Sequence, residues 1–496
     1  MSAATIDVAT SRDAPAARVE TRTASMRWVY ASLAAYVTGL ALFPPRVVLV
    51  ADETRYVEQA LAFNRGLLRI PRSGILYPAE AHRTISDYPP GTSLLQTPFV
   101  WLLGWRGAML VSVLSLIAAT LVTARWLARE GRDPAFALFI PGYIGAAFFG
   151  RIGMSDMPTT ALVATTCMLL WGADGSRGRS WAAGFCAGAV LLFREPPVLI
   201  VLPLLLGAVL RRRAAFVPAT LGFAAAVLAR LALSAWLFGT PWYVRPSGIG
   251  FAPGAIAVTL PVYAALLLVF IPGAALAVIL YRGDRRPELV AAFTLTVLLF
   301  LLYDYDAILL SGPIKGPMQV SRYLAPLLPL VAYMAAEVWP RLATRFASHG
   351  SRVRGALRTS ASLAAVAVAF LIHPIAHRQE AAPLAVVKAL YSYTRADRPI
   401  VTNVDATLKY FSVAYGPRQL VLADRTPLDS LVSFARRYGG LTIAFLDRSD
   451  SEMFRADAAR NARLLMDIGT RCALRPTYRE SFGWAELRTM ELDDCR

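Results

Sequence analysis

Long apolar runs dominate the sequence and most restrict what the chain can fold into. A helix that crosses a bilayer needs about 20 apolar residues, and about eleven runs approach that length. They lie near residues 28–50, 106–127, 134–150, 157–172, 181–193, 197–210, 216–238, 254–281, 289–303, 323–340 and 359–373. Only 17% of the 496 residues are charged, which excludes an ordinary soluble globular protein. The sequence therefore predicts a polytopic α-helical membrane protein with about eleven transmembrane helices.

The arginine-rich loops predict an orientation for these helices. If the N-terminus lies in the cytoplasm, "RRRAAF", "YRGDRR" and every other dense arginine cluster fall on the inside, as the positive-inside rule requires. The first run exceeds the ~7–15 apolar residues of a secretory signal, so we expect an uncleaved first helix. An odd number of helices places the C-terminus outside. We expect a multi-pass protein of the inner (plasma) membrane.

The same loops account for the strong positive charge. The net charge of +18 comes from 51 basic and 33 acidic residues. No basic run is interleaved with aromatic residues, so the pattern argues against a nucleic-acid partner and for contact with membrane lipid.

The chain changes character near Pro374. Short β-rich runs such as "LTIAFLDR" then alternate with helix-like segments such as "LDSLVSFARRYGG". We expect a cytoplasmic tail at 1–27, a membrane domain at 28–373 and an extracytoplasmic α/β domain at 374–496. Cys472 and Cys495 lie in this last part, where an oxidising compartment would allow a disulfide.

Charged residues gather in the loops that this topology places outside. The first outer loop begins with "ADETRYVEQ", whose spacing favours an interfacial helix, and "SDYPPGTSLLQ" predicts a second interfacial or re-entrant piece. Taken singly, each charge has an ordinary explanation as a solvated helix cap or an interfacial anchor. Together they bring acids and bases to one face: Asp52, Glu53, Arg151, Asp156, Lys315 and Arg322.

The order of these motifs resembles the GT-C class of membrane glycosyltransferases, which includes protein O-mannosyltransferases and the lipid A aminoarabinose transferase. "ADETRYVEQA" resembles the acidic opening of that class after the first helix. "YPPG" is similar to its Pro-Pro motif, with Tyr88 in place of the common Lys. "RIGMSDMP" resembles its second acidic motif, and "SRYLAPLLP" its late Arg-Tyr element. The resemblance covers roughly the first 340 residues.

The resemblance implies transfer of a sugar from a polyprenyl-phosphate donor to an acceptor hydroxyl on the outer side of the membrane. The acceptor would be an envelope glycan, a lipid or a protein. By resemblance, Asp52 is the expected base, Glu53 supports it or contacts the acceptor, and Asp156 orients the acceptor or holds a cation. Lys315 and Arg322 are the candidates for the donor phosphate. Two aspartates alone are too few ligands to require a divalent cation.

Further charged residues lie within or beside apolar runs. Arg194 and Glu195 interrupt "LLFREPPVLIVLPLLL", where we expect a mutual ion pair that fixes packing or serves the site. Arg230 in "AAAVLARLALSAW" either snorkels outward or meets the donor phosphate. His373 and His377 have no glutamate between them, so they do not form a zinc-protease motif.

Two other classes of protein remain as alternatives. A lipid or sugar transporter would place its ionisable residues near the bilayer midplane, often in repeated halves, whereas no repeat is visible here and the acids cluster at one boundary. A non-catalytic envelope assembly protein would carry the same acids as solvated caps. It would lack a site that joins Asp52, Asp156 and Arg322.

The expected topology predicts the compartment of the C-terminus. A reporter that is active only outside the cytoplasm, fused after Arg496, should be active, because an odd helix count follows a cytoplasmic N-terminus. A fusion with a reporter that works only in the cytoplasm is the control. Activity of that control fusion instead would overturn both the orientation and the side assigned to the charged loops.

Overall fold

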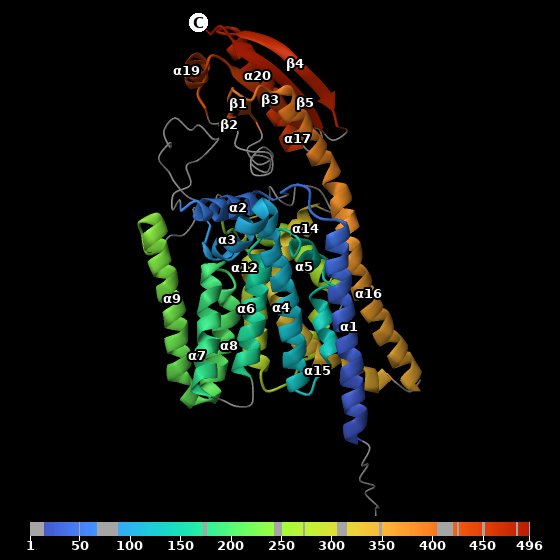
Figure 1. Ribbon diagram of the computed structural model, residues 1–496. Coiled ribbons are helices and arrows are strands. Elements are labelled where there is room, and N and C mark those ends of the chain that lie inside the picture. The colour runs from blue at the N-terminus through green and yellow to red at the C-terminus, as the bar shows by residue number, and fades with distance from the viewer. Residues whose placement is uncertain are drawn as a thin grey trace, which may run out of the picture.

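The computed structural model describes residues 14–48, 50–66, 88–171, 176–242, 250–270, 273–304, 315–346, 350–403, 420–423, 426–448, 452–482 and 485–495. A bundle of upright helices carries a small mixed sheet above one end (Figure 1). Helices α2 (Ala51–Asn64) and α3 (Gly91–Leu103) lie between the bundle and the sheet. We call this end of the bundle the α2 end. The arginine-rich segments at the start of α7 (Arg177–Ala189) and between α8 (Val198–Arg211) and α9 (Phe216–Phe238) lie at the opposite end (Figure 1).

The helices of the bundle follow the apolar runs closely. They are α1 (Ala14–Leu42), α4 (Gly107–Arg129), α5 (Ile144–Phe149), α6 (Asp156–Leu170), α7 (Arg177–Ala189), α8 (Val198–Arg211), α9 (Phe216–Phe238), α10 (Ala255–Ala265), α11 (Ala274–Leu280), α12 (Arg286–Leu301), α14 (Lys315–Ser321), α15 (Leu328–Phe346) and α16 (Gly350–Gln379). Among the described residues, three helical stretches are long and apolar enough to cross a membrane: Gly91–Arg129, Arg213–Phe238 and Arg358–Tyr393.

Two expected helices are divided: the run at 254–281 forms α10 and α11, and the run at 134–150 is also interrupted. The run at 134–150 forms a 3-10 turn, η2 (Pro134–Phe139), followed by the short helix α5. Pro141 and Gly142 interrupt the run, because proline cannot donate an intrahelical hydrogen bond. A Cβ on Gly142 would lie 2.7 Å from the Leu138 carbonyl oxygen and 3.0 Å from the Ala365 Cβ. Glycine therefore lets this turn pack directly against α16.

Small residues also bring α7 and α9 into backbone contact. A Cβ on Gly184 would lie 1.9 Å from the Ala219 carbonyl oxygen, and one on Gly222 would lie 2.0 Å from the Trp181 carbonyl oxygen. Such seams of small residues let membrane helices gain van der Waals contact without a hydrophobic driving force between them. This packing fixes α7, and with it the turn that follows it at the α2 end.

The C-terminal residues form a five-stranded sheet with helices. Its strands run in the order β2 (Leu420–Leu422), β1 (Ile400–Thr402), β3 (Leu441–Arg448), β5 (Ala485–Asp493) and β4 (Ala473–Ser481). The first three strands are parallel, and β5 and β4 are antiparallel to their neighbours. The helices that accompany the sheet are α17 (Ala381–Tyr393), α19 (Leu428–Tyr438) and α20 (Glu452–Gly469).

The change of structure comes later than the sequence indicated. Helix α16 runs through Pro374 to Gln379, α17 follows almost at once, and the first strand begins at Ile400. A proline in a helix removes one hydrogen bond without always ending the helix. The polar composition after Pro374 therefore begins while the chain is still helical.

A disulfide joins Cys472 to Cys495, 23 residues apart, and ties the start of β4 to the C-terminal end. Replacing both with serine should lower the unfolding free energy of the sheet by about 3 kcal/mol, because the unfolded chain regains the entropy of a closed loop. Thermal unfolding with and without a reductant measures the loss. The control is Cys186→Ser, since Cys186 is a free thiol. Unfolding of the wild type that ignores the reductant would contradict the prediction.

Candidate active site

Asp52 lies in the first turn of α2, at the α2 end of the bundle. Its Oδ2 accepts a hydrogen bond from Arg322 Nη2 at 2.9 Å, and its Oδ1 accepts one from the Tyr88 hydroxyl. About a quarter of the side chain is exposed. Burial by itself raises the pKa of the carboxyl, but Arg322, Tyr88 and Arg194 outweigh that effect and the net pKa lies below its ordinary value. Asp52 is therefore ionised at neutral pH.

Asp156 opens α6, directly after the turn of residues 151–155. Its Oδ1 lies 2.5 Å from Arg194 Nη1. Its Oδ2 is buried and has no hydrogen-bond partner, and only 1% of the residue is exposed. A buried carboxylate oxygen without a donor is costly. This atom is placed to accept a hydrogen bond from a ligand.

Arg322 begins the 3-10 turn η6 (Arg322–Leu327). The Tyr143 hydroxyl donates to the Ser321 carbonyl oxygen at 2.8 Å and fixes the start of this turn. Arg322 Nη2 contacts Asp52 and the Tyr323 hydroxyl, whereas Nε and Nη1 are buried without a hydrogen-bond partner. Only 7% of the residue is exposed. The guanidinium thus has unused donors in a buried position.

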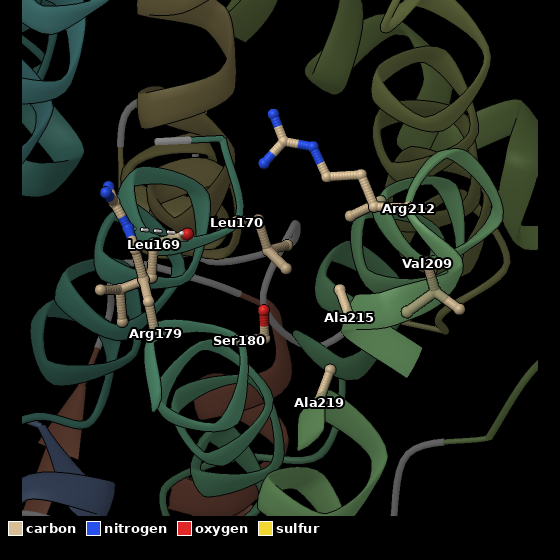
Figure 2. Close-up of a pocket in the computed structure, with 9 residues that line it drawn as sticks. Leu169, Leu170, Arg179, Ser180, Val209, Arg212, Ala215 and Ala219 are labelled. Atoms are coloured by element: carbon tan, nitrogen blue, oxygen red, sulfur yellow. Dashed lines mark hydrogen bonds between the residues drawn. The ribbon is translucent and has the colours of Figure 1, made fainter. Parts of the chain in front are cut away.

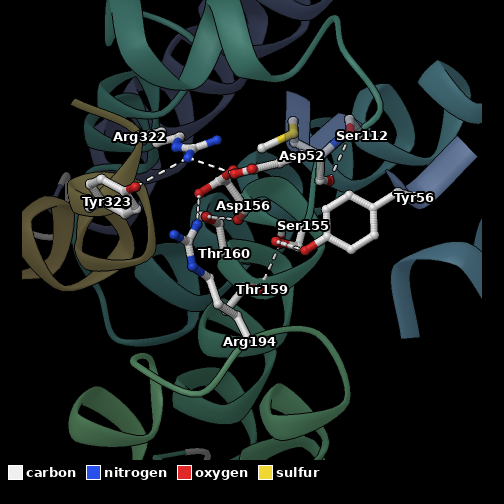
Figure 3. Close-up of polar contacts among 11 residues, drawn as sticks. Asp52, Tyr56, Ser112, Ser155, Asp156, Thr159, Thr160, Arg194, Arg322 and Tyr323 are labelled. Atoms are coloured by element: carbon white, nitrogen blue, oxygen red, sulfur yellow. Dashed lines mark hydrogen bonds and ion pairs between the residues drawn. The ribbon is translucent and has the colours of Figure 1, made fainter. Parts of the chain in front are cut away.

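The two carboxylates and the two arginines form one cluster. Figure 3 shows Asp52 and Asp156 close together, with Arg322 on one side and Arg194 on the other. The guanidiniums of Arg194 and Arg322 lie 4.6 Å and 5.0 Å from the centre of the Tyr323 ring. The cluster offers unused donors on Arg322 and an unused acceptor on Asp156. A ligand with an anionic oxygen and a hydroxyl group would satisfy both.

Hydrogen bonds from neighbouring helices hold the turn that carries Asp156. Gln96 Nε2 donates to the Gly153 carbonyl oxygen at 3.0 Å, and Ser112 Oγ donates to the Met154 carbonyl oxygen at 3.1 Å. The Tyr56 hydroxyl donates to Ser155 Oγ at 3.1 Å. None of these residues is among the site residues that the motifs in the sequence predict. They carry no charge, and only the fold brings them together.

Glu53 contacts the turn that precedes Asp156. Its side chain is fully buried, and its Oε1 accepts a hydrogen bond from the Gly153 backbone N–H at 2.6 Å. It therefore joins α2 to the 151–155 turn. Its contacts suit a supporting role rather than direct contact with a substrate.

Arg151 lies outside the cluster. Its Nη2 lies 3.1 Å from Glu380 Oε1, and both side chains are fully buried. The sequence analysis did not single out Glu380, although a carboxylate at the end of an apolar helix is an available signal.

Three other predicted charges meet different partners from those expected. Arg194 pairs with Asp156, and Glu195 lies 3.7 Å from Arg230, so the expected mutual pair of Arg194 and Glu195 is not formed. Arg194 and Glu195 are neighbours in the chain, and their side chains point in different directions, toward Asp156 and Arg230 respectively. Arg230 Nε also donates to the Leu191 carbonyl oxygen at 3.1 Å. Arg230 thus holds the turn that carries Arg194.

Tyr88 and Lys315 complete the predicted set. The Tyr88 ring lies 5.0 Å from the Tyr56 ring, beside Asp52. Lys315 begins α14, and its side chain lies outside the described residues. Within the described ranges, no group of three or more His, Cys, Asp or Glu residues is arranged to hold a metal ion.

A separate pocket lies among the ends of α6, α7 and α8 and the start of α9 (Figure 2). Its lining includes Arg179 and Arg212 but no carboxylate. Arg179 donates to the Met168 and Leu169 carbonyl oxygens at 2.7 Å and 3.1 Å, so it satisfies the last turn of α6. Without a base, this pocket does not compete with the Asp52–Asp156 cluster as an active site.

The chain has the fold of the GT-C class of membrane glycosyltransferases, which confirms the resemblance drawn from its motifs at the level of the fold. The structure of ArnT from Cupriavidus metallidurans in the apo state matches with a TM-score of 0.59 and 14% sequence identity, covering 94% of this chain and 97% of that one. The same values hold for ArnT bound to undecaprenyl phosphate.

A third structure, the mycobacterial arabinofuranosyltransferase AftD, matches with a TM-score of 0.48 and 12% identity, covering 94% of this chain and 41% of that one. No protein-family model matches the chain, and no curated protein matches it.

The Glu53 contact predicts a graded effect of substitution on stability. Glu53→Ala should lower the unfolding free energy by about 1–3 kcal/mol, because it leaves the buried Gly153 N–H without an acceptor. Glu53→Gln should be milder, since an amide oxygen still accepts that hydrogen bond. Thermal unfolding in detergent measures both. The control is Glu58→Ala on the same helix, whose partly exposed pair with Arg55 is worth at most about 1 kcal/mol. Equal losses for Glu53→Ala and Glu58→Ala would contradict the assignment.

Proposed function

We propose that the protein is a membrane glycosyltransferase that moves a sugar from a polyprenyl-phosphate donor to an acceptor hydroxyl on the outer side of the membrane. The observation that carries the proposal is the pair of unused groups in the cluster: buried donors on Arg322 and a buried acceptor oxygen on Asp156. A sugar linked to a phosphate presents an anionic oxygen and hydroxyl groups together. The acceptor is an envelope glycan, a lipid or a protein.

The charge balance of the cluster favours a donor with one phosphate. Each carboxylate is paired with one arginine, so the four side chains sum to zero. A monophosphate-linked sugar adds one negative charge, and the unused N–H groups of Arg322 can donate hydrogen bonds to its phosphate oxygens. The structure of ArnT with undecaprenyl phosphate supports a lipid phosphate as the ligand class. Lys315 remains a second candidate for this phosphate, and this charge balance does not itself require a divalent cation.

In the proposed reaction, the acceptor oxygen attacks the anomeric carbon of the donor sugar. A new C–O bond forms, and the bond between that carbon and the phosphate oxygen breaks. The phosphate leaves with the electron pair, and Arg322 neutralises it. Asp52 takes the proton of the acceptor hydroxyl, and Asp156 holds a sugar hydroxyl. A phosphate bound to Arg322 competes with Asp52 for that positive charge, so the donor itself makes Asp52 a stronger base.

We also propose the orientation and domain division expected from the sequence. The α2 end faces outward from the inner (plasma) membrane, with residues 1–27 in the cytoplasm, 28–373 in the membrane domain and 374–496 outside. The formation of the Cys472–Cys495 disulfide supports an oxidising compartment for the sheet. The arginine-rich turns at the opposite end support a cytoplasmic location for that end.

The proposal predicts that Asp52→Asn abolishes transfer while the protein remains folded and inserted. The amide keeps the size of the carboxylate but cannot accept the proton, and losing a general base typically lowers the rate ~10²–10⁴-fold. The assay uses membranes, a pool of polyprenyl-phosphate sugars and the native acceptor. Expression level is measured in parallel.

Two outcomes separate the base from its alternatives. Transfer that falls only in proportion to protein level would make Asp52 a structural cap. Silencing by Glu53→Gln with normal transfer by Asp52→Asn would exchange the roles of the two residues. As a separate arm, Arg322→Ala should weaken binding of polyprenyl phosphate without sugar, whereas Asp52→Asn should retain it. Unchanged binding by Arg322→Ala would remove Arg322 from the donor site.

A further inference from the structure

A buried ion pair joins the turn before Asp156 to the end of α16. Arg151 Nη2 lies 3.1 Å from Glu380 Oε1, and both side chains have no exposed surface. Arg151 also donates to the Phe43 carbonyl oxygen at 3.1 Å and to the His373 carbonyl oxygen at 3.3 Å. Arg151 therefore connects the 151–155 turn with the end of α1 and with α16.

Glu380 holds the segment that leads from α1 to Asp52. Its Oε2 accepts a hydrogen bond from the Arg46 backbone N–H at 2.8 Å. Two residues earlier, the Pro44 carbonyl oxygen lies 3.0 Å from His377 Nδ1. We call residues 43–48 the strap. These contacts hold the strap against the junction of α16 and α17. Helix α2 begins three residues after the strap ends.

The strap also enters the core of the C-terminal sheet. Val47 is fully buried and belongs to the same hydrophobic cluster as Val386 and Leu390 of α17 and Ile400 and Leu446 of the sheet. Packing of Val47 against α17 and the sheet thus sets the position of the strap, together with the hydrogen bond to Glu380. Asp52 follows Val47 by only five residues.

We propose that Arg151 and Glu380 are positioning residues, which hold Asp52 and Asp156 at a working separation and tie that separation to the C-terminal sheet. Arg151 belongs to the chain segment that ends in Asp156, and Glu380 holds the segment that ends in Asp52. Neither residue contacts the cluster, so their effect passes through backbone. The inference rests on the proposed function for its kinetic part only.

The pair can hold the two segments together because each charge is costly to bury without the other. Removing one partner of such a pair leaves an uncompensated buried charge, so the two segments separate only together with a large local rearrangement. A pair of this kind resists small displacements of the strap and the turn. Displacement of reacting groups by about 1 Å can lower a rate by about 10²-fold.

The test compares Glu380→Ala with Glu380→Gln. Glu380→Ala should lower kcat for sugar transfer by up to about 10²-fold and leave KM for the polyprenyl-phosphate donor unchanged, because Arg322 is untouched. Glu380→Gln should recover part of the loss, since its amide still accepts from the Arg46 N–H. The control is Glu288→Gln, which alters another buried carboxylate, paired with the partly exposed Arg211, and should leave kcat unchanged.

Hydrogen exchange provides a readout that does not depend on activity. Amides of α2 and of the 151–155 turn should lose protection in Glu380→Ala and keep it in Glu288→Gln. Retained protection and normal kcat in Glu380→Ala would overturn the inference, as would a rate that falls only with the amount of folded protein. If the wild type transfers no sugar from any polyprenyl-phosphate donor, the proposed function fails, and hydrogen exchange still decides the positioning role.

Discussion

The pairing of Asp52 with Arg322 and of Asp156 with Arg194 is the interaction on which the arrangement of the α2 end depends. Carboxylates this deeply placed are tolerated only beside opposite charge and hydrogen-bond donors. Four separate chain segments must therefore converge: α2, the start of α6, the turn after α7 and the turn η6. The glycine seam of α7 and α9, the Arg230 contacts and the Tyr143 hydrogen bond each fix one of these segments.

The two ion pairs leave the cluster without net charge, but some of its hydrogen-bonding groups have no partner. Arg322 keeps buried N–H groups and Asp156 keeps a buried oxygen without partners, although most buried polar groups in proteins are hydrogen-bonded. Unmet groups of opposite character at one place are a better indication of a ligand than either charge alone. This place lies at the end of the helical bundle, beside α2 (Figure 1).

The sequence predicted those features that depend on local chemistry. Apolar length located α4, α6, α9 and most other helices, and short motifs located Asp52, Asp156 and Arg322. It could not assign partners, because Arg194 and Glu195 are neighbours in the chain yet bind Asp156 and Arg230. Nor could it assign Arg151 as the partner of Glu380, because the two residues lie 229 positions apart in the sequence. The helix through Pro374 escaped prediction because composition changes before the backbone does.

The near-continuous passage from α16 into α17 joins the sheet to the bundle by helix instead of by an extended linker. At about 1.5 Å per residue, the 30 residues of α16 alone span about 45 Å. Any change in the position of the sheet relative to the bundle would therefore have to bend or shift α16, because no extended linker separates the two.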